Sequence, residues 1–178
     1  MIGLTKGQVA EWMLQHVPEG TPIKAKPGLP QPGNGYEVFS FPLPGDSGKK
    51  TWLARTAYDS FIAERRVLVY LQNWQVFPSG GHIPLLLRLR EALGESRPIE
   101  QCPGCLFSSD EGEDVISMMV LSLQFFWDCL VVAESGKTAL FISHDECLDL
   151  ISADASILLR FKKAIGGVRD DLGREAAL

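Results

Sequence analysis

Apolar residues recur every three to four positions in four stretches of the chain, and this spacing predicts amphipathic helices. The helices are expected over residues 5–17, 82–93, 111–124 and 145–165. Thr5 precedes the first helix as its N-cap, and Gly94 follows the second as its stop. The third helix is apolar on nearly every side, which indicates a central place in the core.

Shorter runs rich in β-branched and aromatic residues predict about five strands. They are expected at residues 36–41, 51–57, 67–72, 127–133 and 138–143. The last two flank the turn sequence Glu134-Ser135-Gly136-Lys137, so we expect them to form a hairpin. These elements together predict the α+β class, with a mostly antiparallel sheet of about five strands and helices packed on one face.

The 178 residues have the length of a single domain. Segment 18–35 is dense in proline and glycine and is expected to be an extended connector, and 167–178 is expected to be a frayed tail. The predicted core comprises Leu86, Leu89, Ile116, Met119, Leu123, Trp127, Leu130, Val132, Leu140 and Ile142.

The charge of the chain restricts its partners. The formal net charge is −5, the pI is about 5.2, and lysines and arginines form no run. Nucleic acids and anionic membranes require a concentrated basic face, so we expect neither as a partner. An acidic surface suits a basic protein partner instead. The sequence makes no prediction of the oligomeric state.

The apolar run 115–132 has nearly the length of a membrane span. It contains Gln124 and Asp128 and crosses a predicted helix–strand boundary, so we expect it in a protein core. The first residues lack the basic-then-apolar pattern of a secretory signal. We therefore expect a cytoplasmic protein whose four cysteines are thiols.

The sequence Ser143-His144-Asp145-Glu146 supports two interpretations. In the first, Ser143 and Glu146 form a capping box at the start of the helix over 145–165. In the second, His144 and Asp145 perform acid–base chemistry, as a histidine beside carboxylates can. Capping does not require His144, which keeps the catalytic interpretation open.

The four cysteines include a C-x-x-C pair, Cys102 and Cys105. Together with His144 and Cys147 this pair would supply the Cys3His ligand set of a zinc site, provided that the fold brings the two halves together. The alternative is that these cysteines are free thiols in a loop. No other cofactor is predicted.

Three segments carry a family resemblance: W-Q-V-F-P-S from Trp74, W-D at Trp127 and S-H-D-E from Ser143. In this order they resemble a group of small bacterial α+β proteins, some of which are similar to the immunity proteins of polymorphic toxin systems. The resemblance covers residues 67–150, implies no catalytic residue, and does not include Cys102.

Three hypotheses of function follow. The leading one is a non-catalytic cytosolic binding protein with a protein partner, of the type of a toxin inhibitor that the resemblance implies. The second is a metal-dependent or hydrolytic enzyme that uses the turn from Ser143 to Glu146. The third is a structural domain held together by zinc.

Overall fold

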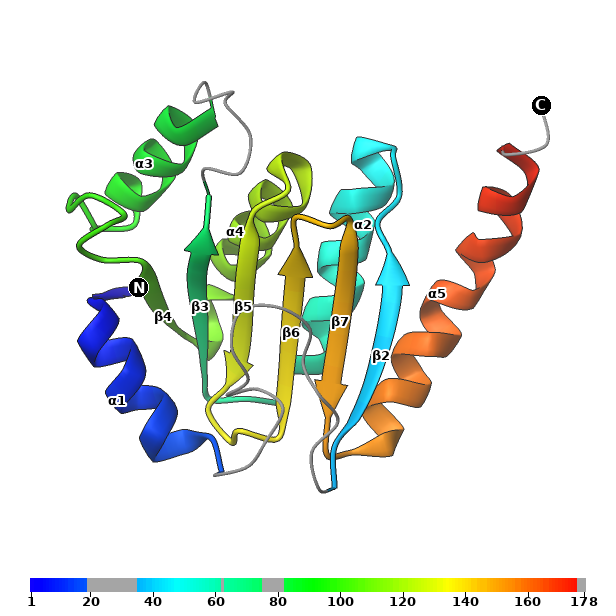
Figure 1. Cartoon of the computed structure of the whole chain (residues 1–178), viewed down its shortest axis with the longest axis horizontal. Coiled ribbons are helices and arrows are strands. Elements are labelled where there is room, and N and C mark those ends of the chain that lie inside the picture. The colour runs from blue at the N-terminus through cyan, green and yellow to red at the C-terminus, as the bar shows by residue number, and fades with distance from the viewer. Residues whose placement is uncertain (19–34, 62, 75–81, 176–178) are drawn as a thin grey trace.

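The computed structural model describes residues 1–18, 35–61, 63–74 and 82–175, with the backbone alone for 167–175. It contains one seven-stranded antiparallel sheet in the order β1-β4-β3-β5-β6-β7-β2 (Figure 1). The strands are β1 Ile2–Leu4, β2 Glu37–Pro42, β3 Arg66–Asn73, β4 Gly104–Ser108, β5 Asp128–Ala133, β6 Thr138–Ser143 and β7 Cys147–Ser152.

Five helices pack against this sheet, which confirms the predicted α+β class. They are α1 Lys6–His16, α2 Ser47–Tyr58, α3 Ile83–Ala92, α4 Gly112–Phe125 and α5 Ala155–Glu175. In the described part of the chain, the 3-10 turn η2 Asp59–Phe61 follows α2 and the 3-10 turn η4 Ser109–Glu111 precedes α4. Among the described helices, none is long and apolar enough to cross a membrane.

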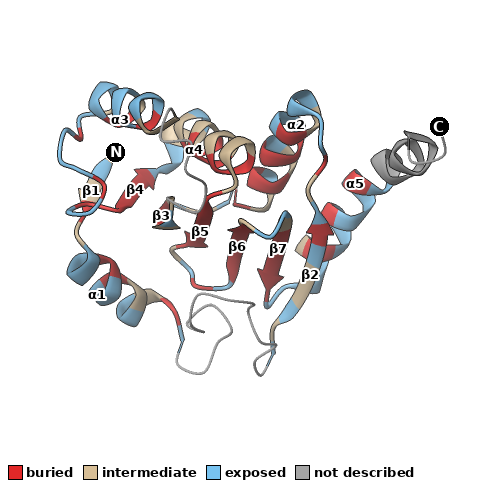
Figure 2. Ribbon diagram, turned by 45° about the horizontal axis from the view of Figure 1, so that its top comes forward, coloured by how far each residue is buried: buried red, intermediate tan, exposed pale blue. Residues whose placement is uncertain are grey.

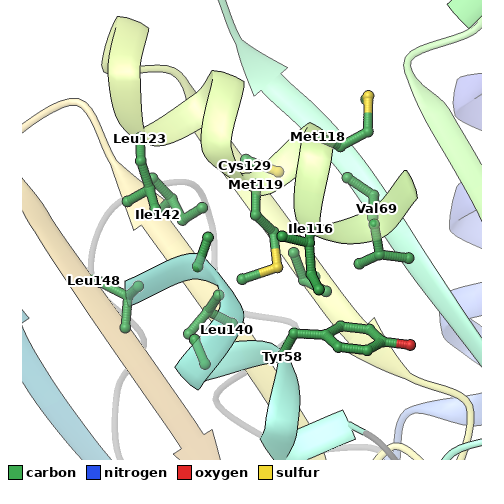
Figure 3. Packing of buried hydrophobic residues seen from close by; sticks show 14 of the residues in the cluster. Tyr58, Val69, Ile116, Met118, Met119, Leu123, Cys129, Leu140, Ile142 and Leu148 are labelled. Atoms are coloured by element: carbon green, nitrogen blue, oxygen red, sulfur yellow. The ribbon is translucent and has the colours of Figure 1, made fainter. Parts of the chain in front are cut away.

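One side of the sheet, the first face, is covered by α2, α4 and α5. Because successive strand residues point to opposite sides, Val69, Val131 and Leu140 all lie on this face. Leu53 of α2 and Phe161 of α5 are buried in the same cluster. Figure 3 shows the α4 part of this core, where Met119 and Leu123 lie over the strands. This face forms the larger apolar core.

The opposite side, the second face, has its own buried cluster. Val9 and Trp12 of α1 belong to it, with Leu68, Leu130 and Phe141 from three strands. The structure thus differs from the expectation of helices on one face alone, because α1 lies opposite α2, α4 and α5. The physical reason is that β5 is buried at every position and so requires cover on both faces.

Local sequence signals predicted many of these helices and strands correctly. Helices α1, α3 and α4 and the β5–β6 hairpin lie where they were predicted. Thr5 caps α1 in a capping box with Gln8, whose backbone N–H lies 3.3 Å from the Thr5 hydroxyl oxygen. All predicted core residues are buried except Leu89, which is partly exposed.

The predicted strand over 51–57 is wrong, because these residues belong to α2. Asp46 starts this helix: its side chain accepts a hydrogen bond from the backbone N–H of Lys49 at 2.8 Å. Leu53, Ala54 and Ala57 then fall on one side of the helix and are fully buried. Helix capping and packing therefore outweigh the β propensity of the threonines and the tryptophan.

The predicted helix over 145–165 is wrong in its first part. Residues Cys147–Ser152 form β7, which pairs with β6 on one side and β2 on the other, and α5 begins only at Ala155. The turn from Ser143 to Glu146 therefore joins two strands. Two further strands, β1 and β4, were not predicted.

Part of the predicted organisation falls outside the described residues. This holds for most of the connector 18–35, for the sequence from Gln75 to Ser79 and for the last three residues of the tail 167–178. Helix α5 continues through Glu175 and so includes most of that tail.

Candidate functional site

His144 is held by Asp128, the first residue of the neighbouring strand β5. One oxygen of Asp128, Oδ1, accepts the backbone N–H of His144 and lies 2.8 Å from both that nitrogen and the ring Nδ1. The ring Nε2 lies 3.5 Å from Asp145 Oδ1. The hydrogen bond to Asp128 raises the pKa of His144. With 34% of its side chain exposed, His144 is a surface imidazole clamped to a buried carboxylate.

The capping box predicted for Ser143 and Glu146 does not form, because no helix begins here. The Ser143 hydroxyl instead accepts the backbone N–H of Asp145 at 3.1 Å, within the turn. Glu146 adopts a left-handed backbone with φ 60°, and its carbonyl accepts the N–H of Leu43 at 2.8 Å. Asp128 is the partner of His144 that sequence reasoning missed.

The four predicted zinc ligands lie in two separate places. Cys102 and Cys105 are at β4, whereas His144 and Cys147 are at the β6–β7 turn, and strands β3 and β5 lie between. Strands are spaced about 4.8 Å apart, so roughly 14 Å separate β4 from β6. Ligands of one zinc ion, at about 2.3 Å for a cysteine sulfur and about 2.0 Å for a histidine nitrogen, lie far closer together. Across the described ranges, no three His, Cys, Asp or Glu side chains form a group able to hold a metal ion.

The cysteines are also poorly suited to nucleophilic chemistry. Burial is the largest cause of a raised pKa at every one of them, to about 11 for Cys102 and about 12 for Cys129. A cysteine nucleophile requires a lowered pKa, because only the thiolate reacts. Cys102 instead donates its thiol proton to Glu95, with Sγ 3.2 Å from Oε2.

An apolar groove lies between α2, α3 and α4, with a volume of about 460 Å³. We call it the helical groove; its lining residues are Thr51, Arg55, Leu85, Leu89, Glu113, Ile116, Ser117, Val120 and Leu121. Leu85 is 54% exposed at this groove. Figure 2 shows α3 as a largely exposed helix beside α4.

One wall of the helical groove carries an ion pair. Arg55 donates two hydrogen bonds to the carboxylate of Glu113, at 2.8 and 2.7 Å. Both side chains remain more than half exposed. The groove therefore offers an apolar floor with paired charges at its rim, an arrangement typical of a protein-binding surface.

No family model, curated protein or solved structure matches the chain.

Proposed function

We propose that the protein is a non-catalytic binding protein, and that the helical groove holds an amphipathic helix of a partner protein. The observation that carries the proposal is Leu85, a large apolar side chain more than half exposed over an apolar groove. The exposed part of this side chain adds little to the stability of the free protein, whereas a partner helix would bury it. Grooves of this kind receive apolar side chains spaced three, four and seven residues apart on a helix.

The charge of the chain supports a particular kind of partner. The net charge of −5 favours a helix with basic residues beside its apolar stripe. Arg55 and Glu113 at the rim provide a donor and an acceptor for the polar edge of that helix. Because the pair is exposed, we expect it to affect specificity and association rate more than affinity.

The resemblance of the chain to proteins similar to immunity proteins supports a narrower form of the same proposal. In that form the partner is a protein toxin, the complex is inhibitory, and the protein acts in the cytoplasm.

A second candidate is a hydrolytic enzyme that uses His144. The observation that favours it is the hydrogen bond that the ring Nδ1–H of His144 donates to Asp128, because a carboxylate in this position orients a histidine that acts as a general base. This candidate predicts an activity that His144→Ala abolishes while partner binding is retained.

Affinity capture with two matched leucine variants tests the leading proposal. Leu85 and Leu159 are both exposed helical leucines, but only Leu85 lines the helical groove. We expect Leu85→Asp to reduce partner binding at least tenfold and Leu159→Asp to leave it unchanged.

The captured partner is then identified, and the affinity of its candidate helix is measured as a synthetic peptide by calorimetry. Equal binding of peptide to the wild type and Leu85→Asp would refute the role of the groove.

A further inference from the structure

A cavity separate from the helical groove lies between α2 and α5, and its volume is about 210 Å³. We call it the α2–α5 pocket; its lining residues are Thr56, Asp59, Ser60, Ile157, Arg160, Phe161 and Ala164. None of these residues lines the helical groove. Binding in the α2–α5 pocket is therefore independent of the function proposed for the groove.

The spacing of the lining residues turns two helix faces toward each other. On α5, the lining residues follow Ile157 at three, four and seven positions along the chain, so they share one face of the helix. Thr56 is in the last turn of α2, and Asp59 and Ser60 follow it at three and four positions. Helices α2 and α5 are in contact, and the pocket is the space that their facing side chains leave open.

The floor of the pocket is apolar. Phe161 is only 2% exposed and belongs to the larger core. Ile157 packs against the same core from one turn before it, and Ala164 lies one turn after it. Sites for drug-sized ligands have volumes of roughly 300–1,000 Å³, so a pocket of about 210 Å³ suits a smaller molecule with one short apolar group.

Two opposite charges line this pocket without pairing. Asp59 comes from the end of α2 and Arg160 from α5, and both residues are exposed. Within the described ranges, neither side chain takes part in a hydrogen bond or a close ion pair. Each interacts only through space with a charge outside the pocket, Asp59 with Arg55 and Arg160 with Asp154. Both charged groups are therefore open to a ligand.

The surroundings of the two charges select opposite groups on that ligand. Asp59 is the C-cap of α2, where the carbonyl end of the helix adds partial negative charge, so this side of the pocket favours an ammonium group. Arg160 favours a carboxylate, because the guanidinium fork donates two parallel hydrogen bonds to its oxygens. Arg160 would repel a simple cation and Asp59 a simple anion, whereas a molecule that carries both charges satisfies both sides.

We propose that the α2–α5 pocket binds a free α-amino acid with an apolar side chain. Asp59 accepts hydrogen bonds from the ammonium group, and Arg160 donates hydrogen bonds to the carboxylate. The floor at Phe161 covers the apolar side chain. The hydroxyl groups of Thr56 and Ser60 supply further donors and acceptors in the pocket.

A titration with L-leucine tests the proposal on the full chain. The amide shifts of ¹⁵N-labelled protein follow binding, and we expect saturable shifts at Thr56, Asp59, Ser60 and Arg160. Leucinamide lacks the carboxylate and N-acetyl-leucine lacks the ammonium group. Each is expected to bind at least about tenfold more weakly, because one charged hydrogen-bond partner is lost. Glycine keeps both charges but lacks the apolar side chain, and it is also expected to bind more weakly than L-leucine.

Charge variants assign each end of the ligand to its side chain. Arg160→Gln should weaken L-leucine binding at least about tenfold and should lose the preference for L-leucine over leucinamide. Asp59→Asn should weaken binding similarly and lose the preference over N-acetyl-leucine. Lys163→Gln and Asp110→Asn are the matched controls, because each removes an exposed charge outside the pocket. Both controls should bind L-leucine as the wild type does.

Ala164→Leu fills the pocket without removing a charge. Ala164 is exposed, so the variant is expected to fold, and its longer side chain should occupy the apolar floor. We expect it to abolish saturable binding of L-leucine. Retained binding would place the ligand elsewhere on the protein and overturn the proposal.

The wild-type titration can also overturn the proposal directly. Absence of saturable shifts with L-leucine, equal binding of leucinamide or N-acetyl-leucine, or unchanged affinity in Arg160→Gln or Asp59→Asn would each do so. Leu85→Asp, in the helical groove, should bind L-leucine as the wild type does. This variant distinguishes the failure of the α2–α5 pocket from the failure of the proposed function.

Discussion

Glu95 and Asp149 are both buried carboxylates, at opposite ends of the sheet, and their surroundings differ completely. Glu95 accepts hydrogen bonds from the backbone N–H and the guanidinium of Arg97 and from the thiol of Cys102. Asp149 accepts none from the residues that the structure describes. The hydrogen bonds from Arg97 lower the pKa of Glu95 to about 2. A buried carboxylate whose oxygens are hydrogen-bonded is compatible with a stable fold, whereas one left without hydrogen bonds costs stability.

The two carboxylates also differ in where their neighbours come from. Arg97 and Cys102 lie within seven residues of Glu95 in the sequence, so one loop supplies the whole arrangement. The neighbours of Asp149 come from β2 and β6, which only the sheet brings together.

Glu95→Gln is expected to change the free energy of unfolding more than any other variant, and it is the first test of this contrast. The variant should lose about 2–3 kcal/mol of unfolding free energy at pH 7. This is less than the lowering of the Glu95 pKa from 4.5 to about 2 implies, because Arg97 is partly exposed and solvent screens the ion pair. Since the folded pKa is depressed, this stability is present above about pH 4.5 and is lost as the pH falls toward 2. Urea unfolding at several pH values measures it, with the exposed Glu91→Gln as control. An acid profile identical to that of the wild type would show that Glu95 contributes nothing.

Gly3→Ala probes the same end of the sheet without removing a charge. An added Cβ would lie 1.6 Å from Glu95 Oε2 and 2.8 Å from Cys102 Sγ, so the network around Glu95 must shift. We expect a loss of about 1–3 kcal/mol in denaturant unfolding. Gly7→Ala is the control, because its Cβ meets only Thr5 Oγ1 at 4.0 Å. Equal stability of the two variants would mean that the network adapts freely.

Asp149→Asn should change the free energy of unfolding in the opposite direction to Glu95→Gln. Replacing a buried carboxylate that accepts no hydrogen bond by a neutral amide of the same size should raise the unfolding free energy by about 1 kcal/mol. The same urea experiment at pH 7 measures the sign. A loss of stability would break the contrast, because Asp149 would then support the fold as Glu95 does.

Asp128→Asn has the smallest expected effect and tests the clamp on His144. The raised pKa of His144 means that its ion pair is fully present below about pH 6.5 and is lost as the pH rises through the folded pKa. The wild type should therefore exceed Asp128→Asn in stability most at pH 5–6. With the ring about one-third exposed, solvent screening should hold the difference below about 1 kcal/mol. Thermal unfolding from pH 5 to 9 measures it, and a pH-independent difference would exclude the ion pair as its cause.

Elements specified by local signals could be predicted from the sequence. The Thr5 capping box, the apolar periodicity of α4 and the turn at Gly136 each act within a few residues, and the corresponding elements are correct. β7 could not be predicted, because it is buried between β6 and the distant strand β2, and a short apolar run suits a helix equally well. For the candidate site, His144 was identified and its partner Asp128 was not.

By itself, then, the sequence determined the α+β class, the apolar core and the clustering of polar groups around His144. The tertiary structure decided which of those groups meet. It separated Cys102 and Cys105 from Cys147 by three intervening strands, β3, β5 and β6, and it enclosed Asp149 without a hydrogen-bond partner among the described residues. The physical reason is that strand order depends on pairing between distant segments, whereas periodicity, caps and turns report only on their immediate neighbours.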